Sequence, residues 1–354
     1  MSKELIIMPC RIEDVPQVKS FYNTNWRADH PQMKDDLFEW FYHANPARPS
    51  AIDYTLMLAL QEGEVVGSIA FNPCKFHYEN FDYTGAWLGM FMTHPDHRRK
   101  GVSKAMLAEL QDMYHVLAVT SVSKLGEAAY VKMGFDYCTN FTRYVAVLNA
   151  EDCMSLITGI KGYVRNELER RHLLLPGERL YGDDITKEHS DMPPTGVDML
   201  ERSCTNKYYI RTVKSREWLK WRYAEHPTFK YTFLEVYKKG ILIGLAVVRL
   251  EATGGVNVGR VMEFMARKEG EKILASTLTE WGEGNKCCMI DFFSGSAPMP
   301  ILEQVGFRLS CGMSMPWLFQ PIDHDRLVTN FTLWPKTNKE VMVTKGDGDL
   351  DRPN

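Results

Sequence analysis

The chain has 354 residues, the length of about two ordinary domains, with 45% hydrophobic and 25% charged residues, which is typical of globular proteins. A net charge of −3 argues against a dedicated nucleic-acid-binding protein. No apolar run reaches the roughly 18–20 residues of a membrane span and no signal-peptide pattern opens the chain, so we expect a soluble, cytoplasmic protein.

The first predicted elements are an aromatic segment and a β-hairpin. Residues 37–46 (LFEWFYHANP) end in Asn-Pro. Two β-rich runs, 54–60 and 65–71, then flank a Glu-Gly-Glu turn. A glycine-bearing turn between such runs predicts two antiparallel strands.

A basic turn between a strand and a helix is the clearest signal in the chain. The apolar run 87–92 leads into a turn rich in His, Arg and Lys, and a helical pattern of apolar residues follows from Ala105 to Met113. The first turn of a helix leaves backbone N–H groups unpaired, and these groups and the helix dipole favour phosphate. The turn therefore predicts an anion-binding site.

A second motif follows the predicted strand 116–122 (VLAVTSV). In 123–135 (SKLGEAAYVKMGF), Tyr130 stands four residues before Gly134-Phe135. The two motifs, in this order, resemble those of the GNAT N-acyltransferases. The family pattern Arg/Gln-x-x-Gly-x-Gly/Ala is read at Arg98, Gly101 and Ser103, with Ser in the place of Gly or Ala.

The resemblance implies acyl-CoA as co-substrate, either acetyl-CoA or a longer or hydroxyacyl-CoA. The residues implied in binding it are Met92, Thr93, Arg98, Arg99, Lys100, Gly101, Val102, Ser103, Lys104, Ala105, Ser123 and Tyr130. Tyr130 is also implied to be the general acid that protonates the departing thiolate, the alternative being a residue that only packs the cofactor. The cysteines show no Cys-x-x-Cys pair and no zinc-type spacing, so no metal is expected.

The sequence leaves the general base open. GNAT members often carry a Glu on the strand before the basic turn, but 86–92 (AWLGMFM) has no carboxylate. One alternative is that the amine binds largely neutral and loses its proton through water, so that positioning supplies most of the rate. Otherwise the base comes from elsewhere, and the candidates are His94, Glu263 and Asp291.

An internal repeat predicts a second module. Residues 218–227 (WLKWRYAEHP) resemble 37–46, with Trp221 aligned on Trp40, and a second hairpin pattern follows at 231–237 and 241–248. Gly306-Phe307 repeats Gly134-Phe135 near the end of each copy. We therefore expect an α+β protein of two tandem GNAT modules, each a mixed, mostly antiparallel sheet flanked by helices.

The expected division is a first module at 1–150 that binds acyl-CoA, a helix and linker at 151–197, a second module at 198–325 and a C-terminal tail at 326–354. The helix is expected in the amphipathic run 154–174, and the last 15 or so residues look frayed. In the second module the strand 261–266 leads into RKEGEK, whose acidic side chains oppose phosphate. This module is expected to be degenerate and to shape the acceptor site.

The second aromatic segment points to an acceptor. Its Trp-x-Tyr followed by His-Pro is similar to GNAT-like sugar N-acyltransferases of bacterial surface-polysaccharide pathways. This resemblance implies a small-molecule amine, a nucleotide-linked amino sugar, bound in the cleft between modules. The residues implied in binding it are Trp87, Trp221, Arg222, Tyr223 and Arg249, although core packing is the ordinary role of such aromatics.

Two alternatives stay open. The acceptor could be another amine, such as an antibiotic, a small metabolite or a peptide; an acidic cleft would favour a polycationic amine and a basic cleft a nucleotide diphosphate. The chain could also be a non-catalytic acyl-CoA-binding protein that kept the fold. In either case we expect a monomer or a homodimer.

Overall fold

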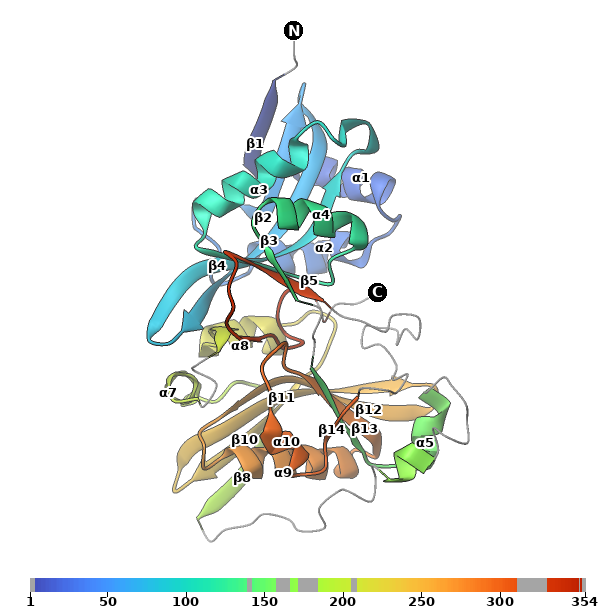
Figure 1. Ribbon diagram of the computed structural model, residues 1–354, viewed down its shortest axis with the longest axis vertical. Helices are drawn as coiled ribbons and strands as arrows, with labels where there is room; N and C mark the ends of the chain where they lie inside the picture. Colours follow the sequence, from blue (N-terminus) through green and yellow to red (C-terminus); the bar gives the residue numbers. More distant parts are fainter. Residues whose placement is uncertain are drawn as a thin grey trace.

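Two mixed β-sheets, each flanked by helices, lie one above the other (Figure 1). The computed structural model describes residues 4–138, 142–156, 166–170, 184–204, 209–310, 330–349 and 351. Both sheets are mostly antiparallel, which confirms the predicted fold class. Among the described helices, none is long and apolar enough to cross a membrane.

The upper sheet is built mainly from the N-terminal half. In spatial order its strands are β1 (Leu5–Cys10), β2 (Tyr54–Gln61), β3 (Glu64–Tyr78), β4 (Phe81–Thr93), β5 (Val116–Thr120), β15 (Phe331–Trp334) and β6 (Asp136–Cys138); β9 (Ile210–Thr212) pairs with β3 and with β16 (Val341–Met342). Its helices are α1 (Val15–Asn25), α2 (Asp35–Phe38), α3 (Val102–Met113) and α4 (Lys124–Lys132). Within the path from β1 to β6, β4 and β5 are parallel and the other neighbours are antiparallel.

The lower sheet is built mainly from the C-terminal half. In spatial order its strands are β8 (Ile185–Ser190), β10 (Thr232–Lys238), β11 (Ile241–Thr253), β12 (Val256–Ala266), β13 (Cys287–Phe293), β7 (Arg143–Val147) and β14 (Arg308–Leu309). The accompanying helices are α5 (Ala150–Cys153), α7 (Val197–Arg202), α8 (Arg216–Leu219), α9 (Glu271–Gly284) and α10 (Pro300–Glu303). Here β12 and β13 form the parallel pair, at the position that β4 and β5 hold above.

The two halves contribute strands to each other's sheets: β9, β15 and β16 from the second half join the upper sheet, and β7 from the first half joins the lower one. β15, from near the end of the chain, lies between β5 and β6 in the upper sheet. In return β7, from the first 150 residues, lies between β13 and β14 in the lower sheet. The sequence-based division placed β7 in the first module and β15 in the tail, and nothing in their sequences predicted this exchange.

The repeat found in the sequence has a counterpart in the structure. The aligned segments Glu39–His43 (η3) and Lys220–Ala224 (η7) are both short π-helices. Trp40 and Trp221 stack with their rings 5.4 Å apart, and each indole N–H donates to the backbone carbonyl of the other residue at 2.9 Å. The two aligned aromatic segments therefore meet each other where the modules join.

Residues 341–349 and Asp351, here called the closing segment, run between the two sheets and contradict the expectation of a frayed end. Asp347 and Asp351 are 1% and 2% exposed. Lys214 pairs with Asp347 at 2.5 Å and Arg249 with Asp351 at 2.7 Å, so buried cations compensate the buried carboxylates. The polar composition of the segment suggested a solvated tail. The cations that pair with its carboxylates are distant in the sequence, so composition alone did not reveal them.

The other predicted elements match observed ones with shifted bounds, and the strand predicted at 116–122 ends at Thr120. Both hairpins form, as β2–β3 and β10–β11, and the helix of the basic turn is α3. The apolar face of α3 packs on the upper sheet through Met106, Leu107 and Leu110, all fully buried. Most of the expected helix at 154–174 lies outside the described residues; Met154–Leu156 form a 3-10 turn and 166–170 are helical.

Candidate active site

β4 and β5 separate at the centre of the upper sheet. Their parallel pairing runs from Gly85 with Val116 to Leu88 with Val119. β5 ends at Thr120, whereas β4 continues to Thr93. The β5-facing edge of β4 beyond Leu88 is therefore released from the ladder, next to the connection from β5 to α4.

A bulge on β4 lies at this point. Ala70 pairs with Gly89, but Ser68 pairs with Met92, so Met90 and Phe91 bulge opposite Ile69. Met90 has a φ of +46°, rare for a side chain with a Cβ, and the Tyr22 hydroxyl donates to its carbonyl at 2.5 Å. Bulges re-aim backbone groups and are frequent beside active sites. β12 has the same kind of register shift, at Met262.

The basic turn connects β4 to α3 as an open loop. Arg99 has a φ of +63° and Gly101, the residue before the helix, has a φ of +86°. The exposed charged side chains here are Asp96 and four basic residues: Arg98, Arg99, Lys100 and Lys104. The first-turn N–H groups of α3 face the end of this loop, so the loop offers both backbone donors and positive charge to an anion.

Ser103, the departure from the family pattern, ties the loop to the strand. Its hydroxyl lies 3.0 Å from the Thr93 hydroxyl, and Arg98 Nε donates to the Thr93 carbonyl at 3.3 Å. The side chain is therefore used to fix the loop, and its small size keeps the helix start accessible. Val102 is buried beneath the loop and Ala105 is half-buried.

Tyr130 lies on α4 and contacts the bulge of β4. Its ring is 3% exposed and contacts Phe91 of the bulge at 5.8 Å and Phe135 at 5.0 Å between ring centroids. Burial, with the nearby charge of Asp349, raises the pKa of the Tyr130 hydroxyl, which keeps it protonated. Ser123 caps α4, where its hydroxyl accepts from Gly126 N–H at 3.2 Å.

Asp349 of the closing segment reaches the same place and was missed by sequence reasoning. A methyl group added to Gly89 would lie 3.5 Å from Asp349 Oδ2, so the carboxylate faces the strand just before the bulge. Asp349 is half-buried, unlike the fully buried Asp347 and Asp351. Its position among glycines near the chain end gave no signal that it faces Tyr130.

The three candidate bases lie elsewhere or are already paired. His94 caps the turn, and its Nδ1 accepts from Asp96 N–H at 3.3 Å. Glu263 is 1% exposed and contacts Lys214 at 2.9 Å and the Tyr223 hydroxyl at 2.6 Å; burial raises its pKa.

Asp291 is fully buried in the lower sheet. Burial acts to raise its pKa, but the charges of Lys345, Arg143 and Arg260 outweigh that effect and leave the pKa below its ordinary value. Arg143 lies 2.9 Å from Asp291, and Lys345 also pairs with it. These contacts connect β13, β7 and the closing segment, so Asp291 has a structural role.

The residues expected to bind the acceptor are buried where the modules meet. Trp87 is 2% exposed and donates to Thr212 at 3.0 Å, and Trp221 is held by Trp40. Arg222 Nε donates to the Gly346 carbonyl at 2.9 Å, and Arg249 pairs with Asp351. The structure thus brings these residues together, but around the closing segment.

The second module lacks a comparable loop. Residues 267–270 alone connect β12 to α9, whereas residues 94–101 connect β4 to α3. Gly270 also lies directly against β11: an added Cβ would meet the Ile243 carbonyl oxygen at 2.4 Å. There is little room here for a bound diphosphate.

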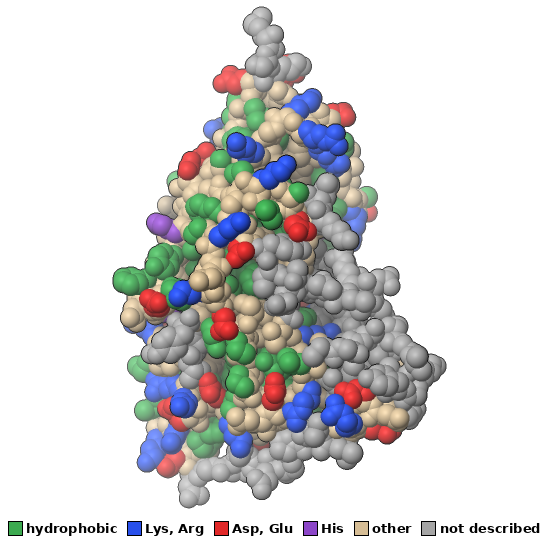
Figure 2. Space-filling model, in the orientation of Figure 1, with side chains coloured by type: hydrophobic (Ala, Val, Ile, Leu, Met, Phe, Trp, Pro, Cys, Tyr) green, Lys and Arg blue, Asp and Glu red, His purple; other side chains and the backbone are tan. Residues whose placement is uncertain are grey.

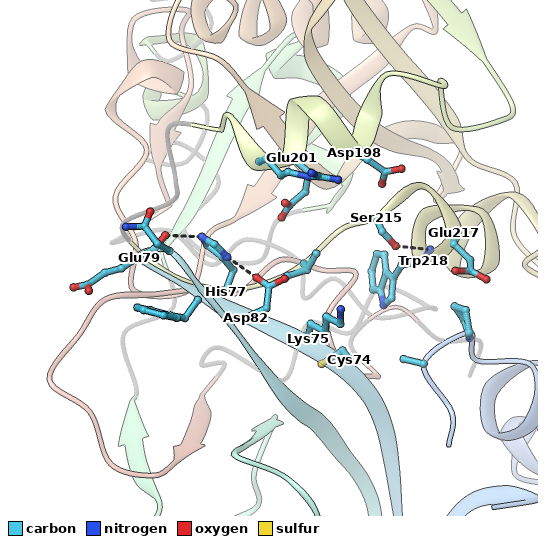
Figure 3. A pocket seen from close by; sticks show the side chains of 16 residues that line it. Cys74, Lys75, His77, Glu79, Asp82, Asp198, Glu201, Ser215, Glu217 and Trp218 are labelled. Atoms are coloured by element: carbon cyan, nitrogen blue, oxygen red, sulfur yellow. Dashed lines mark hydrogen bonds and ion pairs between the residues drawn. The ribbon is translucent and has the colours of Figure 1, made fainter. Parts of the chain in front are cut away.

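A separate cavity of about 860 Å³ lies at the side of the molecule, between β3 and helices α7 and α8 (Figure 3). Among the carboxylates that line it, Asp82 pairs with His77 at 2.6 Å, Glu201 pairs with Arg211, and Asp198 accepts from Arg216 N–H at 2.8 Å. Over the face drawn in Figure 2, both signs of charge are interspersed. Within the described ranges, no group of three or more His, Cys, Asp or Glu side chains is arranged to hold a metal ion.

Comparison with known proteins agrees with this geometry. Residues 7–138 match the model of the acetyltransferase (GNAT) domain family. No curated protein sequence matches the chain. Similar solved structures include a GCN5-related N-acetyltransferase from Anabaena variabilis ATCC 29413, with 9% identity, a TM-score of 0.61, and coverage of 93% of this chain and 72% of that one.

Two further structures give the same result. A conserved protein of unknown function from Enterococcus faecalis V583 has 11% identity and a TM-score of 0.60, covering 94% of this chain and 72% of that one. A GCN5-related N-acetyltransferase from Kribbella flavida has 12% identity and a TM-score of 0.58, covering 94% and 71%. At such identities the likeness concerns the fold across both modules. The chain therefore has the GNAT fold, and its residues 7–138 match the model of the acetyltransferase (GNAT) domain family.

Proposed function

We propose that the protein is an acyl-CoA-dependent N-acyltransferase whose reaction takes place at the β4 bulge of the first module. The observation that carries this proposal is the separation of β4 from β5 beyond Leu88, next to the bulge at Met90. An extended pantetheine arm can pair with a released strand edge. The adjoining loop at Arg98–Ala105 supplies N–H groups and positive charge for the pyrophosphate.

The reaction is direct attack of the amine on the thioester carbonyl. Backbone N–H groups of the bulge would polarise that carbonyl, and binding in one orientation supplies much of the rate. Tyr130 would protonate the departing thiolate, because burial keeps its hydroxyl protonated until the thiolate forms. Ser123 at the start of α4 would border the pantetheine arm.

The proposed acceptor is a small-molecule primary amine. A nucleotide-linked amino sugar, which the sequence favoured, needs basic groups for its diphosphate, and Arg222 and Arg249 already bind the closing segment. The carboxylate of Asp349 beside Gly89 favours a cationic amine at the reaction centre. The nucleotide-linked amino sugar is therefore one of several acceptors to be tested and not the preferred one.

The test is free-thiol release from acetyl-CoA and hydroxybutyryl-CoA with a panel of polyamines, aminoglycosides, small amines and nucleotide-linked amino sugars. We expect amine-dependent turnover, and Tyr130→Phe should lower kcat by about 100-fold. Tyr83→Phe, an exposed tyrosine on β4, is the matched control and should keep full activity. Acyl-CoA binding without acylation of any amine would contradict the proposal and indicate a binding protein.

A further inference from the structure

The closing segment brings a carboxylate from the far end of the chain to the reaction centre of the first module. Asp349 Oδ2 lies 3.5 Å from the position of a methyl group on Gly89, the residue that precedes the bulge. Gly348, the residue before Asp349, also lies against the first module. An added Cβ there would lie 3.0 Å from Thr120 Oγ1, at the end of β5. The segment thus lies directly against the point where β4 and β5 separate.

The neighbouring carboxylates hold the segment in place. Asp347 binds Lys214 at 2.5 Å and accepts from Thr344 N–H at 2.8 Å. Asp351 binds Arg249 at 2.7 Å and accepts from the Tyr231 hydroxyl at 2.5 Å. Both sets of partners belong to the second module or to the segment itself.

Asp349 faces the other way, towards the first module. It is half-buried, and its charge acts on the Tyr130 hydroxyl. An acidic group and a basic group therefore border the same part of β4, one on α4 and one on the closing segment. The second module's buried cations position this carboxylate without contacting the reacting atoms.

We propose that Asp349 is the general base of the acyl transfer, delivered to the first module by the closing segment and held there by the second module. This inference rests on the proposed function. It also explains why the strand stretch 86–92 has no carboxylate that could act as the base, because the proton acceptor comes from another part of the chain.

The proton balance is complete. The acceptor ammonium gives one proton to Asp349, and the freed lone pair forms the C–N bond with the thioester carbonyl carbon. The C–S bond breaks, and the sulfur takes a proton from the Tyr130 hydroxyl. The tyrosine oxygen recovers the second proton from the acylated nitrogen, which keeps its third as the amide N–H. Asp349 then releases its proton to water.

The test compares Asp349→Asn, Asp349→Ala and two controls in the full chain, using the best amine from the panel. Asp349→Asn should lower kcat at least about 100-fold, while the Kd for acyl-CoA and the unfolding temperature stay near those of the wild type. Formate should restore part of the rate to Asp349→Ala in a concentration-dependent way, because a small carboxylate can replace the missing one. Glu340→Gln, an exposed residue before β16, should leave activity unchanged.

Asp347→Asn separates anchoring from chemistry. It should lower the unfolding temperature through its loss of the Lys214 pair, and formate should not restore its activity. An Asp349→Asn enzyme within about threefold of the wild-type kcat, or an Asp349→Ala enzyme unaffected by formate, would overturn the assignment. A wild-type enzyme that acylates no amine would instead refute the proposed function itself.

Discussion

Gly346 is where the closing segment passes closest to the second module, and replacing it by alanine should release the segment. An added Cβ would lie 1.8 Å from the Tyr223 hydroxyl oxygen and 2.3 Å from Glu263 Oε1. Both distances are far below van der Waals contact, so either Tyr223 or the segment must move. Gly346 is the position in the segment where a single methyl group has this effect on two buried polar atoms.

The cost can be worked out from the bonds that would break. If Tyr223 moves, its 2.6 Å hydrogen bond to Glu263 is lost, and an unsatisfied buried polar group costs about 1–3 kcal/mol. Overpacking of a tight interior adds about 1–3 kcal/mol. If the segment moves instead, the 2.9 Å bond from Arg222 Nε to the Gly346 carbonyl is lost. We therefore expect the free energy of unfolding to fall by about 2–6 kcal/mol.

The assay is urea unfolding followed by tryptophan fluorescence, together with amine-dependent thiol release. Activity should fall with stability, because movement of Gly346 displaces Asp349. Gly284→Ala is the matched control: at the end of α9 its added Cβ meets nothing within 4 Å, so stability should stay equal or rise by up to about 1 kcal/mol. A Gly346→Ala protein within about 0.5 kcal/mol of the wild type would refute the described packing of the segment.

Two further predictions concern the contact between modules. Burial lowers the pKa of His226 to about 3, so below about pH 6.5 the unfolded chain binds a proton that the folded chain does not. The free energy of unfolding should therefore fall as the pH drops from 6.5 towards 3. Urea unfolding across that range should show a smaller loss in His226→Gln than in the wild type. Trp40→Phe and Trp221→Phe each remove one of two equivalent indole hydrogen bonds, so each should lower stability by about 1–3 kcal/mol; a large effect in one variant and none in the other would contradict the symmetric contact.

Local patterns predicted the elements that carry the proposed acyl-CoA site. The strand, basic turn and helix around Arg98 and Gly101 are a local strand-to-helix connection, and β4, the loop and α3 form as expected. Tyr130 lies on the expected helix, beside the bulge of β4. The alignment of Trp221 on Trp40 located the segment at which the two modules meet, because both copies keep the same π-helical geometry.

Contacts between segments distant in the chain could not be predicted from local patterns. β15 is a four-residue strand whose partners β5 and β6 lie about 200 residues earlier in the chain, and its composition does not say which sheet it joins. The closing segment looked solvated because it is rich in Asp and Gly. Its burial depends on Lys214 and Arg249, cations whose own sequence surroundings gave no sign of such partners.

The exchange of β7 and β15 also governs the order in which the protein can assemble. The upper sheet keeps an unfilled position between β5 and β6 until residues 331–334 have been synthesised, although its other main strands are complete by residue 138. β7 consists of five residues that are buried in the folded protein, and β13, with which it pairs, is synthesised much later. A nascent first half therefore carries open strand edges, which are sites of mispairing and aggregation. Separately expressed halves should accordingly be poorly soluble, and co-expression should recover material only where each half receives its strand from the other.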